Sequence, residues 1–559
     1  MEPSDLTPAE ARVWAAFPRG TALDFRTSVD EDITLGADWG PERTLRAEVL
    51  TKLLLDGPRE AGEIPALRIA GARITGPLYL LYGQVECTVS LLGCHLDDTP
   101  VLFGARLRRV YLGECVLPGL SAGTAVFDGD LSLEDCRVSG PVSLTGAQIA
   151  GTLTLDGAEL GGPGGPRTAG GAGTSPDTGT SPGVGTRAGA DAILELSRAH
   201  VGVALSARSL AAHGESRLDS LTTGGEIRLD AARFIRPGEI ALSATGLQVG
   251  TFLSAVGLVA QGEVRLYGTT VGGTLNLANA RLDNPTDTAL HASNLTVGAD
   301  LRAPGITAHG RVNLRGARIP GQLVLSQATL RHPGDVALRA DGMVVGELWL
   351  RGPSPIEGTL SLRRTQAELI HAEPEAWPAE VRLDGLTYTG LAPHEPAGRR
   401  LPLLSRDADG YVPFSYEQLA LAYRALGDDT AARTVQLAKQ RRHRATLPPH
   451  AKAWGLLQDA TVGYGFRPVR AAGWLFSLLL IGWIAYAVRP PRAPKAEEAP
   501  EFSPFFFTLD LLLPLVGLGQ EGAYVPTGWT QTLSYGLILA GWVLATTIAA
   551  GVTRTISRQ

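Results

Sequence analysis

The chain is poor in cysteine and in charge. Its 559 residues include four Cys, too few for a secreted scaffold held together by disulfides. Charged residues make up 19% of the chain, against about 25% in an average protein, and 44% are hydrophobic. This balance excludes a largely disordered protein. The 50 Lys and Arg are outnumbered by 56 Asp and Glu, so the chain as a whole does not suit nucleic-acid binding.

Short motifs of well-known cofactor and metal sites are also missing. The four Cys form no CxxC or CxxCH, and the ten His form no HExxH. Glycine spacings resembling GxGxxG lie within residues 161–190, but no strand is predicted before them and no helix after them. We therefore predict no cofactor and no metal.

Glycine and leucine recur at regular spacings through the middle of the chain. Residues 142–155, 264–277 and 312–325 share the order apolar-x-Leu-x-Gly-x-x-apolar-x-Gly-x-Leu-x-Leu. Apolar residues alternate over about five positions in each half, which is the period of a β-strand. The halves start 11 residues apart, so two of them make a coil of about 22 residues.

A longer period of 48 residues overlies the shorter one. It is kept by Val-Gly pairs that begin at 201, 249, 297 and 345, by Gly214, Gly262, Gly310 and Gly358, and by Leu218, Leu266, Leu314 and Leu362. We interpret 48 residues as two coils with a few additional loop residues. Because strands this short bury no core alone, the coils must stack on one another.

The repeats predict a mainly β protein in which residues 61–390 form a parallel, right-handed β-helix of roughly a dozen coils. This region is loosely similar to pentapeptide-repeat and bactofilin-like solenoids. A β-propeller is the chief alternative, but the Asn-Gly and Asp-Gly pairs of its hairpin turns are sparse. Residues 161–190, rich in Gly and Pro, are predicted to be a disordered insertion in one coil.

Residues 1–60 are expected to form a helical cap on the β-helix. Thr7, Pro8 and Glu10 predict a helix start with a capping box, and a second helix is expected from Pro41 to Leu55. Residues 1–30 lack the apolar stretch of a signal peptide, which argues against secretion.

Residues 391–470 combine a proline-containing linker with a helical hairpin. Tyr416–Arg444 has the spacing of one tetratricopeptide-like unit with its turn at 427–429, and a plain helical hairpin is the alternative. Residues 411–470 carry nine Lys or Arg against four Asp or Glu. The side chains expected to contact lipid headgroups or an acidic partner are Arg441, Arg442, Arg444, Lys452, Arg467 and Arg470.

Two uncharged stretches near the end of the chain predict a membrane anchor over residues 471–559. Residues 471–488 and 529–552 are 18 and 24 residues long, enough to span a bilayer as helices. Two buried helices of a soluble domain are the alternative. The basic residues before the first span place both termini on the cytoplasmic side of the cell membrane.

The apolar segment 502–520 lies between the two predicted spans. It suits either an interfacial helix or a re-entrant segment. Asp510 is the ionisable residue that we expect at membrane depth.

Three cysteines share one spacing. Cys94, Cys115 and Cys136 are 21 residues apart, which predicts a column in the stack of coils. Coils about 4.8 Å apart bring neighbouring Cα atoms into the disulfide range of about 4.4–6.8 Å. These cysteines are the redox candidates, and reduced thiols that fill the core are the alternative.

Motifs near both ends of the chain resemble one protein family. They are LTPAEARVWAAFPRG at 6–20, VGYGFRP at 462–468 and TLDLLLPLVGLGQE at 508–521. They are similar to actinobacterial membrane proteins commonly labelled membrane-associated oxidoreductases, and the resemblance runs over the whole chain. It implies a membrane location and, through the label, redox activity.

Three functions follow from these features. We expect a non-catalytic scaffold, a cytoplasmic β-helix held at the membrane that binds other proteins or further copies of itself. An oxidoreductase that uses a thiol or an unrecognised cofactor is the first alternative. The second is a pore-like or sensing protein, in which an oligomer combines both spans with residues 502–520.

Overall fold

The chain folds into two compact units. The computed structural model describes residues 5–28, 31–162, 192–352, 356–449, 452, 456, 468–494, 500–513 and 517–556. The first unit comprises Met1–Glu395 and Arg406–Asp409, and the second comprises Pro396–Ser405 and Gly410–Gln559.

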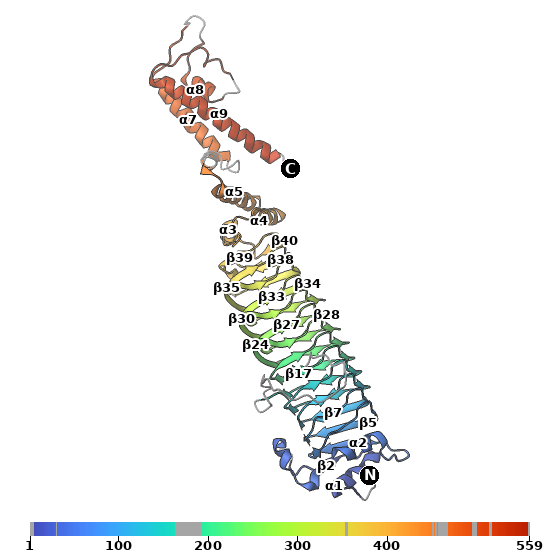
Figure 1. Cartoon of the computed structure of the whole chain (residues 1–559). Helices are drawn as coiled ribbons and strands as arrows, with labels where there is room; N and C mark the ends of the chain where they lie inside the picture. The colour runs from blue at the N-terminus through green and yellow to red at the C-terminus, as the bar shows by residue number, and fades with distance from the viewer. Residues whose placement is uncertain are drawn as a thin grey trace, which may run out of the picture. The chain divides into compact units, whose positions relative to one another are not determined.

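The first unit is a parallel β-solenoid of about 13 turns, with two sheets along its length (Figure 1). Strands of one turn pair in parallel with strands of the turns before and after, as β11, β15 and β19 do. This confirms the predicted parallel β-helix and excludes a propeller, whose blades are antiparallel. The hand of the coil stays a prediction.

Sheet A has 22 strands and sheet B has 18. The strands of sheet A are β1 (Leu23–Asp24), β3 (Ala66–Ala70), β5 (Gln84–Leu92), β7 (Arg106–Gly113), β10 (Val126–Phe127), β11 (Leu131–Ser132), β14 (Gln148–Ile149), β15 (Leu153–Thr154), β18 (His200–Val201), β19 (Leu205–Ser206), β22 (Thr222–Thr223), β23 (Ile227–Arg228), β25 (Gln248–Val249), β26 (Leu253–Ser254), β28 (Thr270–Val271), β29 (Leu275–Asn276), β31 (Thr296–Val297), β32 (Leu301–Arg302), β34 (Arg318–Val324), β36 (Val344–Leu350), β38 (Gln366–Ala372) and β40 (Thr387–Ala392). The strands of sheet B are β2 (Thr44–Arg46), β4 (Arg73–Thr75), β6 (His95–Leu96), β8 (Val116–Leu117), β9 (Leu120–Ser121), β12 (Arg137–Val138), β13 (Val142–Ser143), β16 (Glu159–Leu160), β17 (Ala192–Glu195), β20 (Ala211–Ala212), β21 (Glu215–Arg217), β24 (Arg233–Ser243), β27 (Val259–Arg265), β30 (Arg281–His291), β33 (Thr307–Asn313), β35 (Thr329–Arg339), β37 (Ile356–Ser361) and β39 (Glu380–Arg382).

Ladders of aliphatic side chains fill the inside of the solenoid. Leu131, Leu153 and Leu205 are register partners in adjacent turns, and all three are buried. Full burial of one such side chain contributes about 1.5–3 kcal/mol. Stacking therefore stabilises strands of two residues that would not form alone.

The 48-residue period has a structural cause. Leu253, Leu275 and Leu301 are register partners in three successive turns, so these turns contain 22 and 26 residues. The additional residues form bulges inside the 11-residue strands β24, β30 and β35 of sheet B. The bulges lie at 236–239, 284–287 and 332–335, which confirms two coils with additional residues for each 48.

The glycine column at 262, 310 and 358 follows from these bulges. Gly310 has φ +116°, and a Cβ there would lie 2.2 Å from the carbonyl oxygen of Asn284 and 2.7 Å from that of Asp287. Gly262 and Gly358 meet the carbonyl oxygens of the other two bulges in the same way. A side chain would overlap with the backbone of the preceding turn, so the position needs glycine.

The predicted insertion at 161–190 falls almost wholly outside the described residues, in the gap 163–191. Its flanking strands β16 and β17 pair with β20 and β21, and both of those pair with the two halves of β24. The insertion therefore leaves the solenoid at the place where β24, two turns later, has its bulge.

The N-terminal region joins the end of the solenoid through short strands as well as helices. Its helices are α1 (Pro8–Ala16), α2 (Ala47–Asp56) and the 3-10 segments Phe17–Arg19, Ile33–Asp38 and Pro41–Arg43, and a further 3-10 segment is Pro374–Ala376. The predicted capping box at Thr7 and Glu10 is confirmed. The helix predicted from Pro41 begins only at Ala47, because Thr44–Arg46 pairs with β4 as strand β2.

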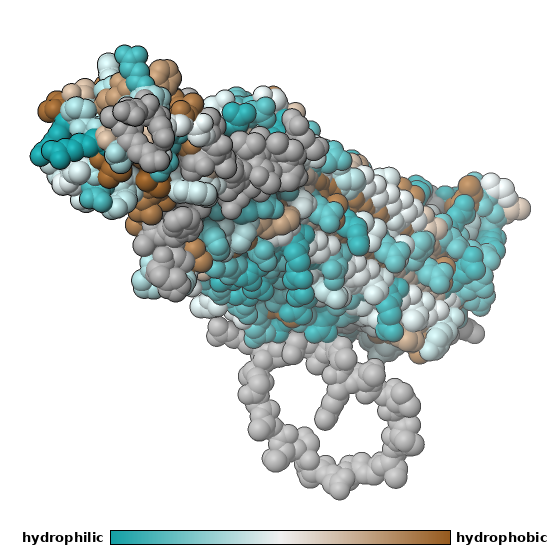
Figure 2. Space-filling model, turned by 90° about the horizontal axis from the view of Figure 1, so that it is seen from above, coloured by the Kyte–Doolittle hydropathy of each residue, from teal (hydrophilic) through white to brown (hydrophobic). Residues whose placement is uncertain are grey.

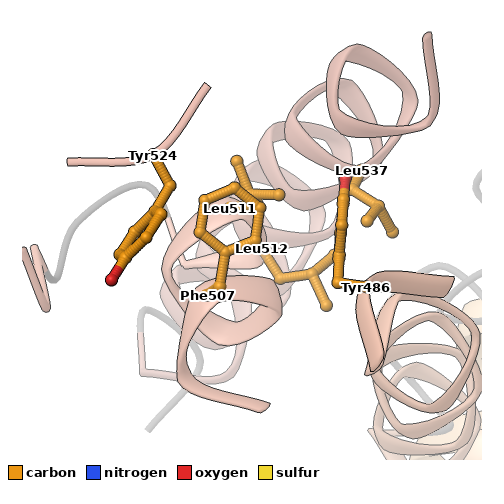
Figure 3. Packing of buried hydrophobic residues seen from close by; sticks show 6 residues of the cluster. All are labelled: Tyr486, Phe507, Leu511, Leu512, Tyr524 and Leu537. Carbon is orange, nitrogen blue, oxygen red and sulfur yellow. The ribbon is translucent and has the colours of Figure 1, made fainter. Parts of the chain in front are cut away.

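The second unit is helical. It contains α3 (Ala397–Leu404), α4 (Pro413–Ala425), α5 (Asp429–Thr446), α7 (Pro468–Val488), α8 (Pro504–Leu512) and α9 (Trp529–Ile556). Helices α4 and α5 form the predicted hairpin, and the side chain of Asp428 caps α5 by accepting a hydrogen bond from the Ala431 N–H. Helices α7, α8 and α9 meet at a buried core of Tyr486, Phe507, Leu511, Leu512, Tyr524 and Leu537 (Figure 3).

Helices α7 and α9 occupy the stretches predicted as spans. A search of the described residues nevertheless found no helix with the length and hydropathy needed to cross a membrane.

Candidate functional site

The three evenly spaced cysteines form one column inside the solenoid. Cys94, Cys115 and Cys136 immediately precede β6, β8 and β12, whose first residues are register partners in successive turns. All three cysteines are fully buried, and none forms a disulfide. The predicted column is therefore confirmed as part of the core.

The surroundings of these thiols suit packing better than redox chemistry. The Sγ of Cys115 lies 3.5 Å from the carbonyl oxygen of Leu91 and 3.3 Å from that of Gly113, and Cys136 Sγ lies 3.1 Å from the carbonyl oxygen of Leu112. Burial raises the pKa of the Cys115 thiol well above its ordinary value. Because the thiolate is the reactive form, this geometry favours reduced thiols that fill the core.

The Asp510 carboxylate is buried in the helical unit. Its Oδ1 accepts a hydrogen bond from the backbone N–H of Leu518 at 2.7 Å, and its Oδ2 accepts from those of Gln520 and Glu521, both at 2.8 Å. Hydrogen bonds to an ionised acceptor are among the stronger ones in proteins. Asp510 therefore ties the end of α8 to the segment before α9, while its depth in a membrane stays a prediction.

Gln520 extends this connection. Its Nε2 donates to the carbonyl oxygen of Glu501 at 3.0 Å, and the Tyr524 hydroxyl donates to the carbonyl oxygen of Pro500. These contacts hold residues 500–503 against 517–524. Sequence reasoning singled out Asp510 by its charge, but it gave no sign of its partners, which lie 8 to 11 residues away in a loop.

The predicted basic cluster lies at the C-terminal end of α5. Arg441 and Arg442 are exposed, Arg444 is half-buried, and Lys452 is exposed. Arg467 lies outside the described residues, and Arg470 lies in α7 with its side chain undescribed. Cationic side chains near the end of a helix also complement its dipole.

The helical unit exposes a large amount of apolar surface. Phe476 on α7 is 67% exposed and Leu539 on α9 is 69% exposed. The large apolar residues exposed on these helices are Trp474, Phe476, Leu480, Ile481, Trp483, Ile484 and Val488 on α7, Phe505 and Phe506 on α8, and Trp529, Tyr535, Leu539 and Trp542 on α9. Apolar surface of this extent marks a site for a membrane or a protein partner.

The outside of the solenoid has a different character. Ion pairs link neighbouring turns, for example Arg106 with Asp128 at 2.9 Å and Arg208 with Asp156 at 2.7 Å. Hydrophilic residues accordingly cover much of the face seen in Figure 2. Such exposed pairs contribute only about 0–1 kcal/mol each, but they keep the surface compatible with water.

Recurring Asp–Ser contacts between turns were not anticipated from the sequence. Asp219 Oδ1 accepts hydrogen bonds from the Ser243 hydroxyl at 2.6 Å and from the Thr245 N–H at 2.8 Å. Asp230 makes the equivalent contacts with Ser254 and the N–H two residues later. These carboxylates therefore stabilise the stacking of turns. In the part of the chain that the structure describes, no group of three or more His, Cys, Asp or Glu is arranged to hold a metal.

Comparison with protein-family models, with curated proteins and with solved structures found no match to this chain. The resemblance to membrane-associated oxidoreductases stays a prediction. The function is therefore argued from the two surfaces described above.

Proposed function

We propose that this chain is a membrane-associated scaffold, whose helical unit binds a lipid bilayer and whose solenoid binds other proteins. The observation that carries the proposal is the exposed apolar surface of α7, α8 and α9. The cysteine column supports a non-catalytic role, because its thiols are sealed in the core.

The side chains on this surface are of the kinds that a bilayer accepts. Moving one large apolar side chain out of water contributes about 1.5–3 kcal/mol, so a few of them suffice for stable binding. Trp and Tyr are favoured at the level of the headgroups, and Trp474, Trp529 and Trp542 are exposed. Arg441 and Arg442 would add about 1 kcal/mol each at an anionic surface.

The proposed arrangement places residues 471–488 and 529–552 in the cell membrane as two spans. Because the basic residues of 411–470 precede the first span, both termini and the solenoid lie on the cytoplasmic side. Protease added to intact cells should then leave the solenoid uncut. Cleavage of residues 61–390 from outside would contradict this orientation.

The solenoid supports the scaffold part of the proposal through its regularity. Its two sheets present the same kind of polar surface over about 13 turns, and solenoids use such extended surfaces for binding. Self-assembly of copies of this chain through the same surface is part of the proposal.

Vesicle flotation tests the membrane part. The full chain, mixed with vesicles of phosphatidylcholine and phosphatidylglycerol, should float with them in a density gradient. Replacing Phe476, Ile481 and Ile484 together by Ser should reduce the floating fraction at least tenfold. The matched control replaces Tyr79, Leu81 and Phe103, three exposed apolar residues of the solenoid, by Ser and should float like wild type. Equal flotation of both triple variants would contradict the proposal.

A further inference from the structure

Sheet A has an open edge near the N-terminal end of the solenoid. Strand β3 pairs with Thr88–Leu92 of β5 and extends no further. At the start of β5, Gln84 and Val85 pair with β7 on one side. The described residues contain no strand on the other side of Gln84–Cys87.

The backbone of this edge points into open space. The Gly83 carbonyl accepts a hydrogen bond from the Arg106 N–H at 2.9 Å or less, on the β7 side, and the Leu92 carbonyl accepts from the Gly71 N–H at 2.9 Å, on the β3 side. Backbone groups alternate along a strand, so the N–H and C=O groups of Gln84 and Glu86 point away from β7. Among the described residues, no hydrogen bond reaches either residue's backbone from that side.

Pro65 explains why β3 stops short of this edge. Continuing the register of Ala66 with Thr88 backwards places the Pro65 nitrogen opposite the Glu86 carbonyl. Proline has no N–H to donate, so the pairing ends there.

A cleft of about 1070 Å³ adjoins the open edge, within the first unit. Its floor includes Gln84 and Glu86, with Arg106 and Arg108 from the next turn. Its wall is the end of α2 and the segment that follows, through Pro65. Arg59 of the wall donates to Glu86 Oε2 at 2.9 Å, which ties wall and floor together.

Acidic side chains outnumber basic ones in the cleft. The charged residues that line it are Asp56, Glu60, Glu63, Glu86 and Asp128, with Arg59, Arg106 and Arg108. Glu60, Glu86 and Asp128 form ion pairs with Arg side chains, whereas Asp56 and Glu63 are exposed and have no ion pair among the described residues. Asp56 also ends α2, where the helix dipole is negative, so this end of the cleft attracts a cation.

We propose that an extended, basic peptide segment of a partner protein binds in this cleft and adds a strand to sheet A beside Gln84–Cys87. Its backbone pairs with the free groups of Gln84 and Glu86, and a Lys or Arg of the peptide lies against Asp56 and Glu63. Strand addition to an open edge is a common mode of peptide recognition. The inference rests on the proposed scaffold function and deepens it by naming one site and one class of partner.

Fluorescence anisotropy with synthetic peptides tests this site. The probe is a fluorescein-labelled peptide of sequence KVKVTK, titrated with the full chain in detergent. A second peptide, EVEVTE, tests charge, and a KVKVTK peptide with N-methyl groups at alternate residues cannot donate along one edge. We expect saturable binding of KVKVTK and at least tenfold weaker binding of the other two. Equal binding of either control peptide, or no binding of KVKVTK at millimolar protein, would overturn the proposal.

Variants locate the site on the protein. Asp56→Lys combined with Glu63→Lys should weaken KVKVTK binding at least tenfold, whereas Glu368→Lys, at an exposed acid on β38 without an ion pair among the described residues, should not. Gln84→Pro removes one edge N–H and should weaken binding similarly, because proline is tolerated at a sheet edge. If that variant unfolds, the N-methyl peptide still tests the pairing. Wild-type flotation with lost peptide binding in the control variant Glu368→Lys would reject this site alone, while loss of wild-type flotation would reject the proposed function.

Discussion

Replacing Gly310 by Ala should unlock the stacking of turns at one bulge. Gly310 lies against the bulge 284–287, and its φ of +116° is one that residues with a side chain rarely adopt. The new Cβ would lie 2.2 Å from the Asn284 carbonyl oxygen and 2.7 Å from that of Asp287. Both atoms belong to the backbone, so neither can rotate away as a side chain could.

Gly342 supplies the matched control for the size of this effect. It has φ +66°, and a Cβ there would meet no atom within 4 Å. Gly342→Ala should therefore cost only the backbone strain, about 1–2 kcal/mol. Gly310→Ala carries backbone strain of about 1–3 kcal/mol and in addition two overlaps with backbone oxygens, so we expect a total of about 4 kcal/mol.

Hydrogen exchange read by mass spectrometry resolves the effect by region, which suits a solenoid whose turns can open separately. In Gly310→Ala, amides of β30 and β33 should exchange faster by about a hundredfold or more, while turns near β11 and β15 stay unchanged. In Gly342→Ala the increase should be about tenfold and confined to neighbouring turns. Equal exchange in both variants would refute the reasoning, because only Gly310 meets the bulge.

Three further predictions concern single groups. After Cys87→Ser, the thiols of Cys94, Cys115 and Cys136 should react with Ellman's reagent only on unfolding, and reaction at the rate of an exposed thiol in the native protein would contradict a sealed column. Burial alone would raise the pKa of Glu10, but hydrogen bonds from Arg46 and the Thr7 N–H outweigh burial and lower it to about 2. Its carboxylate therefore stabilises the N-terminal region above pH 4.5 by about 2–3 kcal/mol, and this is lost as the pH falls towards 2. Pepsin at pH 4 should cut Glu10→Gln within residues 8–56 much faster than wild type, with no difference near pH 2. In Asp510→Asn, the amides of Leu518, Gln520 and Glu521 should exchange at least tenfold faster, since about 1–3 kcal/mol of hydrogen bonding to the carboxylate is lost, and unchanged exchange would show that the carboxylate does not hold this loop.

Features that repeat along the chain could be predicted from the sequence. Alternating apolar residues gave the strands, and the 48-residue period gave two coils with additional residues, because each coil makes the same contacts as its neighbours. The spacing of Cys94, Cys115 and Cys136 matched one turn for the same reason. The capping box at Thr7 depends only on residues three apart, so it too could be predicted.

Features that depend on the register between distant segments could not be predicted. The glycine at 310 was visible as a column, but its cause is the position of the bulge in the preceding turn. Thr44–Arg46 follows a helix-like pattern and becomes a strand because β4 offers it a partner. Asp510 was singled out as a charge in an apolar segment, yet its three N–H donors come from a loop without a recognisable motif. The open edge at Gln84 appears only when β3 and β5 are aligned.

The most direct test of the membrane-associated scaffold is fluorescence quenching by lipids brominated on their acyl chains. Two variants each keep one of the nine Trp, either Trp483 on α7 or Trp349 on β36, with Phe at the other eight positions. With the full chain bound to such vesicles, the emission of Trp483 should be strongly quenched and that of Trp349 should stay as it is in unbrominated lipid. Equal emission of Trp483 in brominated and unbrominated vesicles would contradict the account.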